Sequence, residues 1–255
     1  MGEFEDLVAV VTGGSSGIGA ATATMLAARG ARVASLDRTP PAKMTSAALS
    51  LSCDVSDRAA VDAAIERVVG EFGGLDILVN NAGVGSQGDV TAVDDDEWHR
   101  VLDINVVGAA RVARAAIPHL RRSDHAAIVN TCSVVATIGV PKRAAYAASK
   151  GAMFALSLAM ATDHLAEGIR VNCVNPGTTE TPWVARLMEG SADPEAAAAA
   201  LRARQPMGRL ISPEDVAHAI VYLASPAARS VTGTVVVVDG GLSTVRIPPA
   251  SDDVV

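Results

Sequence analysis

The chain has few aromatic residues, few cysteines and a shortage of positive charge. Of its 255 residues, 3% are aromatic and three are cysteines, and 21 Lys and Arg compare with 28 Asp and Glu. The formal net charge is -7 and the isoelectric point is near 5.2. An excess of acidic residues opposes binding to a phosphate backbone. We therefore expect no nucleic-acid partner.

The chain also lacks a long hydrophobic run. Hydrophobic residues make up 49% of it and the mean hydropathy is +0.30, but no uninterrupted apolar stretch approaches the roughly 18 residues that span a membrane. The N-terminal segment MGEFEDLVAV is acidic where a signal peptide would be basic. These features predict a cytoplasmic protein with no membrane partner and a large buried core.

The cysteines and histidines are too scattered to form a metal site. Cys53, Cys132 and Cys173 contain no CxxC pair, and the five histidines lack the i, i+4 or short-loop spacing of metal ligands. We expect no bound metal. The cysteines are expected to be buried small hydrophobic residues.

Short β-branched runs alternate with helical segments along the chain. The predicted strands are Leu7–Thr12, Arg32–Leu36, Ala48–Cys53, Asp76–Asn80, Ala126–Thr131, Ile169–Val174 and Thr234–Val238. The predicted helices are Ile18–Arg29, Asp57–Glu71, Asp95–Leu120, Tyr146–Glu167 and Pro213–Leu223. Several strands are apolar throughout, which is typical of strands covered on both faces. The alternation predicts an α/β fold with one doubly wound parallel sheet, a Rossmann fold with helices on both faces.

No Pro/Ser-rich linker divides the chain, so residues 1–255 are predicted to form a single dinucleotide-binding catalytic domain. Residues 178–212 do not fit the alternation and are Ala-rich and helical in composition. An insertion at the carboxyl end of a strand lies where ligands bind in such sheets, so we predict a helical substrate lid. A helical excursion without function is the alternative. Residues 245–255 are predicted to be a tail.

A glycine-rich loop, TGGSSGIG at residues 12–19, lies between the first predicted strand and the first predicted helix. Gly13 can adopt the positive φ of a tight turn, and Gly17 lets the backbone approach a pyrophosphate at the helix N-terminus. This order of strand, loop and helix predicts a dinucleotide site. The loop residues assigned to it are Gly13, Ser15, Ser16, Gly17 and Ile18.

Asp37 ends the second predicted strand, about 20 residues beyond the glycine loop, where a carboxylate accepts the ribose hydroxyls of NAD. A 2'-phosphate would be repelled by this carboxylate, so the predicted cofactor is NAD. Arg38 follows Asp37 and is the one feature that could admit NADP. The interpretation we favour is a solvated side chain stacked near the adenine.

Four polar residues form a candidate catalytic group. Tyr146 and Lys150 are four positions apart on a predicted helix and share one face. Ser133 follows the carboxyl end of the fifth predicted strand, the edge at which such sheets bind ligands. Asn105 is the fourth residue of the group. Any of them alone would be unremarkable, because Tyr-xxx-Lys pairs are routine on helix surfaces.

With these residues the sequence closely resembles the short-chain dehydrogenase/reductase family, from about Leu7 to Gly241. The markers are TGGSSGIG, Asp54 with Val55, NNAG at residues 80–83, Asn105, Ser133, Tyr146, Lys150, and Pro176 with Gly177. The resemblance implies that Asp54 and Val55 contact the adenine and that Asn81, Ala82 and Gly83 border the cofactor. It implies that Thr181 lies near the nicotinamide amide or the pyrophosphate, beyond Pro176 and Gly177. It also implies that Asn105 holds a proton-relay water and that the protein is a homotetramer.

The residues themselves suggest the chemistry. Interconversion of an alcohol and a ketone by hydride transfer needs a group that exchanges the hydroxyl proton, and Tyr146 is the best-placed one. A cation about 4 Å from a phenolate contributes roughly 4 kcal/mol at an effective dielectric near 20, and Lys150 is that cation. Ser133 is expected to hydrogen-bond the substrate oxygen. Tyr146 and Lys150 are also assigned to cofactor binding.

Within the family, the sequence is most similar to cytosolic 3-hydroxybutyrate dehydrogenases and 2-keto-3-deoxy sugar-acid dehydrogenases. The similar features are PGTTETPW, RQPMGR and the short span between Asp37 and Asp54. We expect a small hydroxy acid or sugar acid whose carboxylate is bound by Arg143, Arg186 and Arg204. Those arginines could instead be solvated or paired with nearby glutamates. The alternative functions are a neutral-ketone reductase, a non-catalytic NAD(H)-binding protein, and an epimerase or dehydratase, which would need added room for a sugar nucleotide.

Overall fold

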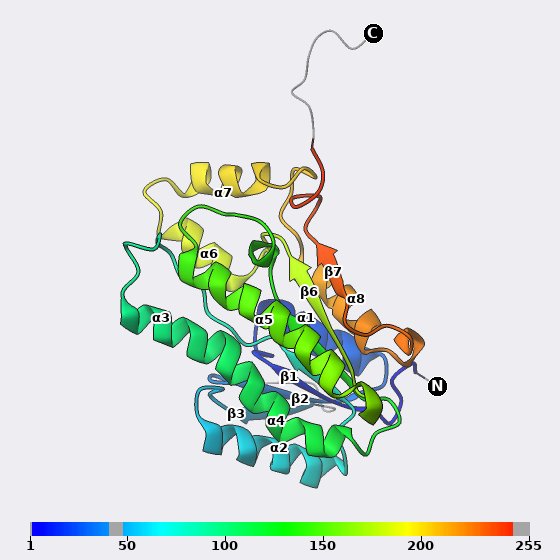
Figure 1. The fold of residues 1–255 in the computed structure, drawn as a ribbon. Helices are drawn as coiled ribbons and strands as arrows, with labels where there is room; N and C mark the ends of the chain where they lie inside the picture. Colours follow the sequence, from blue (N-terminus) through cyan, green and yellow to red (C-terminus); the bar gives the residue numbers. More distant parts are fainter. Residues whose placement is uncertain (1, 41–47, 247–255) are drawn as a thin grey trace, which may run out of the picture.

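The computed structural model describes residues 2–40 and 48–246, and within them seven strands form one sheet (Figure 1). The sheet order is β3-β2-β1-β4-β5-β6-β7, and every neighbouring pair of strands is parallel. The strands are β1 (Val8–Thr12), β2 (Arg32–Asp37), β3 (Ala48–Ser52), β4 (Ile77–Asn80), β5 (Ala127–Thr131), β6 (Arg170–Pro176) and β7 (Val235–Val238). The predicted doubly wound parallel sheet is confirmed, and each predicted strand end agrees within two residues.

Helices cover both faces of the sheet and bury its side chains. On one face lie α1 (Gly17–Ala28) and α8 (Pro213–Ala224), and on the other lie α2 (Arg58–Phe72), α4 (Ala109–Leu120) and α5 (Ala144–Asp163). All residues of β1, β4 and β5 are buried, as expected for apolar strands between two helical layers. The three cysteines are buried and form no disulfide bond. No helix among the described residues is long and apolar enough to cross a membrane.

The region predicted as one helix from Asp95 to Leu120 is interrupted. It consists of α3 (Asp95–Leu102), a π-helical turn (Asp103–Gly108) and α4. The interruption contains Asn105, whose side chain bonds the backbone of Val84 in the loop after β4. A π turn is a single-turn insertion within an α-helix, so the helical region was predicted correctly and its interruption was not.

The helix predicted from Tyr146 to Glu167 begins and ends earlier than expected. Its start at Ala144 follows a bridge between Gly88 and Arg143, which holds the chain just before the first turn. Its end is followed by a 3₁₀ turn (Leu165–Glu167) and by Gly168 at φ 75°. The remaining 3₁₀ turns among the described residues are Val134–Ala136 and Pro226–Ala228.

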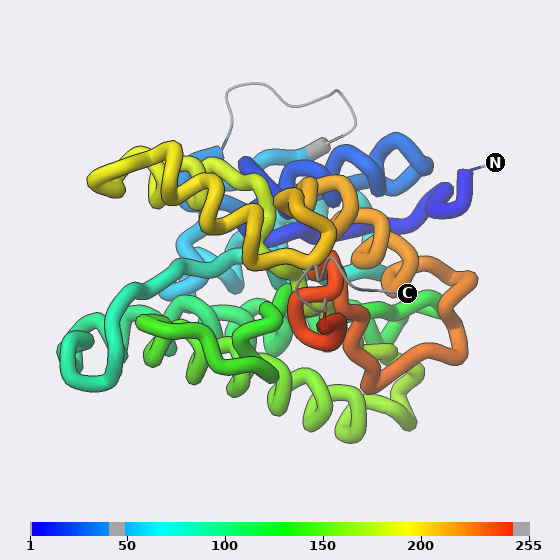
Figure 2. Tube along the Cα trace, turned by 90° about the horizontal axis from the view of Figure 1, so that it is seen from above, coloured from blue at the N-terminus to red at the C-terminus, as the bar shows by residue number. Residues whose placement is uncertain are grey.

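Residues 178–212 contain α6 (Pro182–Glu189) and α7 (Pro194–Ala203), at the carboxyl end of the strands (Figure 1). Figure 2 looks down on this end of the sheet. The base of the segment is tied together by Gln205, whose Nε2 donates to the carbonyls of Thr178 at 3.1 Å and Arg209 at 2.9 Å. The lid role stays a prediction. Of the predicted tail, only Val245 and Arg246 lie within the described residues.

A chain of buried polar side chains fastens α5 to the sheet. Asn80 Nδ2 donates to Asn130 Oδ1 at 3.0 Å, and Asn130 Nδ2 donates to Ser157 Oγ at 2.9 Å. Ser157 Oγ donates in turn to the carbonyl of Met153 at 2.7 Å. Because α5 carries Tyr146 and Lys150, this network sets the position of both residues over the sheet.

Replacing Ser157 with Ala should destabilise the protein, because the buried amide of Asn130 loses an acceptor. We expect the free energy of unfolding to fall by about 1–3 kcal/mol, measured by chemical denaturation. Thr162→Ala is the matched control, since it removes a similar bond to the preceding turn of α5 at an exposed position. Equal losses in the two variants would show that the buried network does not stabilise the fold.

Candidate functional site

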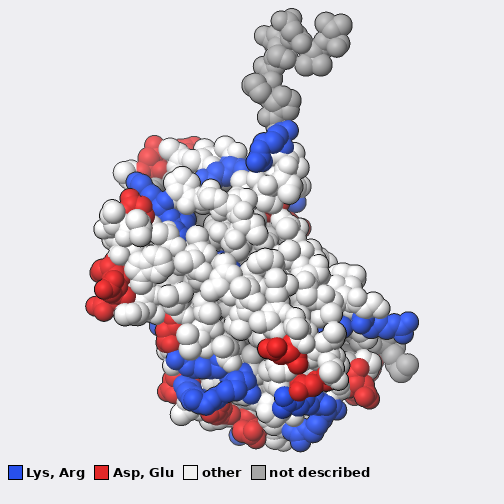
Figure 3. All heavy atoms as spheres, viewed as in Figure 1, with Lys and Arg blue, Asp and Glu red and all other residues white. Residues whose placement is uncertain are grey.

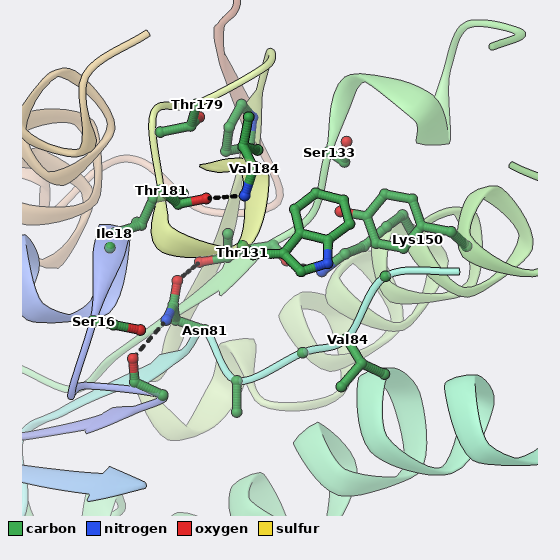
Figure 4. A pocket seen from close by; sticks show the side chains of 18 of the residues that line it. Ser16, Ile18, Asn81, Val84, Thr131, Ser133, Lys150, Thr179, Thr181 and Val184 are labelled. Atoms are coloured by element: carbon green, nitrogen blue, oxygen red, sulfur yellow. Dashed lines mark hydrogen bonds between the residues drawn. The ribbon is translucent and has the colours of Figure 1, made fainter. Parts of the chain in front are cut away.

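A pocket of about 700 Å³ opens at the carboxyl edge of the sheet, and residues of α6 and α7 line part of it. Figure 4 shows several of the side chains that line this pocket. The structure brings together there nearly all the residues that the sequence singled out. Those that line it are Gly13, Ser16, Gly17, Ile18, Asp37, Arg38, Asp54, Val55, Asn81, Ala82, Gly83, Ser133, Arg143, Tyr146, Lys150, Pro176, Gly177, Thr181, Arg186 and Arg204. Ser15 and Asn105 do not line the pocket and lie directly behind its wall.

The glycine loop has the positive φ that the sequence predicted at Gly13, and a second one at Gly17. Gly13 and Gly17 have φ values of 62° and 52°, in the left-handed region that favours glycine. Asn81 supports this loop, because its Nδ2 donates to the carbonyls of Thr12 at 3.1 Å and Gly13 at 3.3 Å. Its Oδ1 accepts a bond from Thr131 Oγ1 at 3.3 Å (Figure 4). The ends of β1, β4 and β5 are thereby joined under the pocket.

Asp37 lies beside the glycine loop at the far end of the pocket. Its carboxylate accepts bonds from the backbone N–H of Ser15 and of Thr39, both at 3.1 Å. Each carboxylate oxygen accepts one of these bonds and retains a further lone pair. The Ser15 N–H thus explains why Ser15 belongs to the site although its side chain does not face the pocket.

Asp54 and Arg38 lie near each other at the same end. Asp54 Oδ1 accepts bonds from the Oγ and N–H of Ser56, and these bonds hold the pKa of Asp54 below its usual range. The positive charges of Arg38 and Arg111 lower that pKa further. The charge of Arg38 is therefore partly balanced by the Asp54 carboxylate.

Ser133, Tyr146 and Lys150 meet at the other end of the pocket. Lys150 is 5% exposed, and its Nζ donates to the carbonyl of Thr131 at 2.8 Å, which leaves two N–H donors for other groups. The same Nζ lies 5.7 Å from the ring centre of Tyr146. Ser133 is buried, and its Oγ accepts only a long 3.4 Å bond from the N–H of Val135. The hydroxyl proton of Ser133 is therefore free to be donated into the pocket.

Asn105 supports the wall of the pocket from behind. Its Oδ1 accepts from the N–H of Val84 at 2.7 Å, and its Nδ2 donates to the carbonyl of Val84 at 2.9 Å and to Ser149 Oγ at 3.0 Å. Val84 lines the pocket. Asn105 therefore joins the π-helical turn, the loop after β4 and helix α5.

The three predicted arginines all line the pocket and lie on different elements, and Arg143 is near both Tyr146 and Arg204. Burial lowers the pKa of Arg143; Tyr146 opposes this effect and the positive charge of Arg204 adds to it. Among the described residues, no ion pair involves Arg143, Arg186 or Arg204. The alternative pairing with glutamates is thus not present in this structure.

The sequence did not identify two prominent residues of this pocket. Arg100, on α3, forms bonds of 2.6 and 2.9 Å with Glu97 and reaches the carbonyl of Gly85 at 3.4 Å. Its only sequence signal was the neighbouring glutamate, which is common on helix surfaces. Trp183, on α6, lies against Tyr146 with ring centres 6.3 Å apart. Trp183 belongs to the PGTTETPW segment noted in the sequence, but no role in the site was assigned to it there.

The parallel sheet and the glycine loop after its first strand define a dinucleotide-binding class of protein. Residues 13–243 match the family model described as Enoyl-(Acyl carrier protein) reductase. A cis-4-hydroxycyclohexanecarboxylate dehydrogenase of Sinomonas cyclohexanicum is 41% identical, over 96% of this chain and 100% of that protein. The 3beta-hydroxysteroid dehydrogenase 1 of Eggerthella lenta is 41% identical, over 94% and 96%.

Among solved structures, the ligand-free aldohexose dehydrogenase of Thermoplasma acidophilum has a TM-score of 0.92 and 35% identity and covers 99% of each chain. The chain belongs to the short-chain dehydrogenase/reductase family, a family of oxidoreductases. The family resemblance noted in the sequence is confirmed. Its two suggested subfamilies stay a prediction.

Members of this family typically use a nicotinamide dinucleotide, and the pocket fits one. The fit rests on the space that two glycines leave in the loop. A Cβ on Gly13 would lie 3.0 Å from the Cα of Ala82, and a Cβ on Gly17 would lie 3.0 Å from Thr181 Cγ2, so a larger residue would be crowded at either position. The bare backbone of this loop can therefore approach a pyrophosphate closely. The acidic residue at the ribose position, Asp37, also faces the same pocket.

Proposed function

We propose that the protein is an NAD-dependent dehydrogenase that interconverts a secondary alcohol and a ketone, and that its substrate is a small hydroxy acid or sugar acid. The observation that carries the proposal is one continuous pocket with Asp37 at one end and Ser133, Tyr146 and Lys150 at the other. Nucleotide binding and acid-base groups in a single pocket are the combination that such a reaction needs.

The residues that would hold NAD are those of the glycine loop, Asp37, Asp54, and the Asn81–Gly83 segment, with Thr181 and Lys150 toward the nicotinamide. When bound, the cofactor supplies the acceptor of a hydride from the alcohol carbon, or the donor in the reverse reaction. Asp37 would accept the ribose hydroxyls through the lone pairs that Ser15 and Thr39 leave free.

Tyr146 would take the hydroxyl proton of the alcohol and return it in the reverse direction. Lys150 would stabilise the resulting phenolate, because its buried ammonium is held next to the Tyr146 ring by the Thr131 carbonyl. Ser133 would donate its free hydroxyl proton to the substrate oxygen. The relay role that the resemblance implies for Asn105 stays a prediction, beside the observed support that it gives to Val84.

Tyr146→Phe should lower turnover by at least about a hundredfold, because it removes the only group placed to exchange the proton. NADH binding, measured by fluorescence titration, should stay nearly intact, whereas Lys150→Ala should damage both turnover and NADH binding. The matched control is Tyr222→Phe, since the chain has only two tyrosines and Tyr222 is 51% exposed on α8. Retention of most activity by Tyr146→Phe would show that the acid-base assignment is wrong.

Charge at the adenosine end supports NAD over NADP. A 2'-phosphate would lie against the Asp37 carboxylate, and Arg38, the nearest compensating cation, is already close to Asp54. The repulsion therefore outweighs the attraction that Arg38 can offer.

Asp37→Ala should narrow the preference for NAD over NADP, measured as the ratio of kcat/KM values for the two cofactors. Asp37→Asn keeps an oxygen acceptor and removes only the charge, so it should narrow the preference while retaining more of the NAD affinity than Asp37→Ala. Equal catalytic efficiency with NAD and NADP in the unmodified protein would contradict the assignment.

Positive charge at the other end of the pocket supports an acidic substrate. Arg143, Arg186 and Arg204 line the pocket together with Arg100 and Lys150, and Arg143 lies near both Tyr146 and Arg204. Arg143 donates one bond to the carbonyl of Ser86 at 3.0 Å and keeps further N–H donors for a carboxylate. The Sinomonas relative is named for a hydroxy carboxylate, which supports the same class.

A neutral alcohol or ketone is the second candidate, because the Eggerthella relative is named for a hydroxysteroid. A non-catalytic NAD(H)-binding role is less well supported, since Tyr146 and Lys150 are both present. An epimerase or dehydratase acting on a sugar nucleotide is disfavoured by the size of the segment that covers the pocket, two short helices.

Arg143→Ala and Arg204→Ala should each lower kcat/KM on 3-hydroxy or 2-keto-3-deoxy acids by about tenfold to a hundredfold, because a charged hydrogen-bond donor is lost. A neutral secondary alcohol should be hardly affected. Arg202→Ala is the matched control. Arg202 is exposed on α7, the helix that ends just before Arg204, and it does not line the pocket. Good turnover of neutral ketones with none of these acids would refute the carboxylate site.

We also propose a homotetramer. Large apolar side chains are exposed on the outer elements: Val107, Leu158 on α5, Tyr222 on α8 and Val237 on β7. Figure 3 shows few charged side chains over α5, whereas charged side chains gather in the lower part of the view, over α2 and much of α4. A surface with few charges, like that over α5, supports packing against a second copy. The cytoplasmic location, the single-domain boundaries and the absence of a nucleic-acid partner stay predictions from the sequence.

A further inference from the structure

The indole of Trp183 lies directly on Gly85, in the loop after β4. A Cβ on Gly85 would lie 2.8 Å from the indole Cε2, which is closer than real Cβ atoms approach, and 3.0 Å from Cη2, which is tighter than most such contacts. Gly85 is not among the glycines with a left-handed φ, so its backbone would accept other residues. The missing side chain therefore serves one purpose at this position, which is to leave room for the indole.

Two arginines hold the backbone on which the indole lies. Arg100 Nη2 donates to the carbonyl of Gly85 at 3.4 Å, and Arg143 Nη1 donates to the carbonyl of Ser86 at 3.0 Å. Arg143 also lies over the Trp183 ring, with its Cζ 5.8 Å from the ring centre. The position of the indole is thus determined by contacts with the loop after β4 as well as by α6.

The indole lies between the group proposed to exchange the proton and a group proposed to bind the carboxylate. Its ring centre is 6.3 Å from that of Tyr146, with an angle of 33° between the rings, and Arg143 lies on it as described. Trp183 is 36% exposed and lines the pocket, and the apolar side chains of Val135, Val140, Leu187 and Leu201 line it as well. This surface can bury an apolar body lying between the reacting carbon and the carboxylate.

We propose that Trp183, seated on Gly85, determines the substrate specificity of this enzyme. The indole selects secondary alcohols that carry a ring between the reacting carbon and the carboxylate, in preference to short straight-chain hydroxy acids. A ring covers the flat indole face, whereas a four-carbon chain leaves most of it in contact with water. This inference rests on the proposed function and specifies its substrate class.

The first test compares kcat/KM on 4-hydroxycyclohexanecarboxylate and on 3-hydroxybutyrate with NAD. We expect the unmodified enzyme to favour the ring acid, and Trp183→Ala to lower kcat/KM on the ring acid by about tenfold or more while changing that on 3-hydroxybutyrate by less than about threefold. Trp98→Phe, at a tryptophan outside the pocket lining, should change neither. Equal losses on both acids would overturn the proposal, as would an unchanged ring-acid efficiency.

A double-mutant cycle tests the role of Gly85. Gly85→Ala should lower kcat/KM on the ring acid about as much as Trp183→Ala does, because the added methyl group displaces the indole. In the Trp183→Ala background the same change should have no further effect. A loss of equal factor in both backgrounds would show that Gly85 acts independently of Trp183 and would overturn the pairing.

A binding measurement separates this inference from the proposed reaction. The chain has two tryptophans, so Trp98→Phe leaves Trp183 as the only indole reporter. With NAD present, cyclohexanecarboxylate should change the Trp183 emission saturably, and butyrate at equal concentration should not. Equal responses, or none to the ring acid, would overturn the inference even where the Tyr146→Phe result supports the reaction. A selective response combined with an active Tyr146→Phe variant would refute the reaction alone.

Discussion

The parallel direction of all seven strands is the constraint on which the site depends. Every loop that follows a strand leaves the sheet at the same edge, so residues far apart in the sequence come to line one pocket. Gly13, Asp37, Asn81, Ser133 and Gly177 follow five different strands in this way. The same direction requires crossover helices on both faces, and strands between two helical layers must be apolar on both sides. The high apolar content of an otherwise charge-poor chain follows from this requirement.

Charge is distributed unevenly along the pocket. Among the described residues that line it, the acidic ones are Asp37 and Asp54, with Arg38 near Asp54, while the other cationic ones are Arg100, Arg143, Lys150, Arg186 and Arg204. Lys150 is the most deeply buried of these cations, and it has no carboxylate partner among the described residues. A buried ammonium without a counter-charge is costly, so the surrounding fold must offset its desolvation. This desolvation cost is consistent with the proposed role of Lys150, which is to stabilise the phenolate form of Tyr146.

The fold could be predicted from the sequence because local patterns of apolar residues and glycines indicate where its strands and helices lie. Apolar runs such as Val8–Thr12 are too short for helices and lack alternation, and Gly30 and Gly168 mark the ends of helical segments by their left-handed backbone. The π-helical turn around Asn105 could not be predicted, because its cause is a contact with Val84 from another part of the chain. Local propensity describes a residue and its neighbours, and this interruption depends on tertiary contacts.

The same distinction separates the predicted from the unpredicted parts of the site. Gly17 could be assigned from the sequence because a strand, a glycine loop and a helix in that order predict a close approach of the backbone to a pyrophosphate. Its left-handed φ of 52° is a further finding of the structure. Gly85 has no such local signal, because the reason for it is the indole of Trp183, brought over it by α6. Both glycines nonetheless leave room for residues at the start of α6, because Thr181 packs on Gly17 and Trp183 packs on Gly85. Thr181, the N-cap of α6, and Trp183 in its first turn therefore both lie against bare backbone, and two absent side chains leave the room that this placement needs.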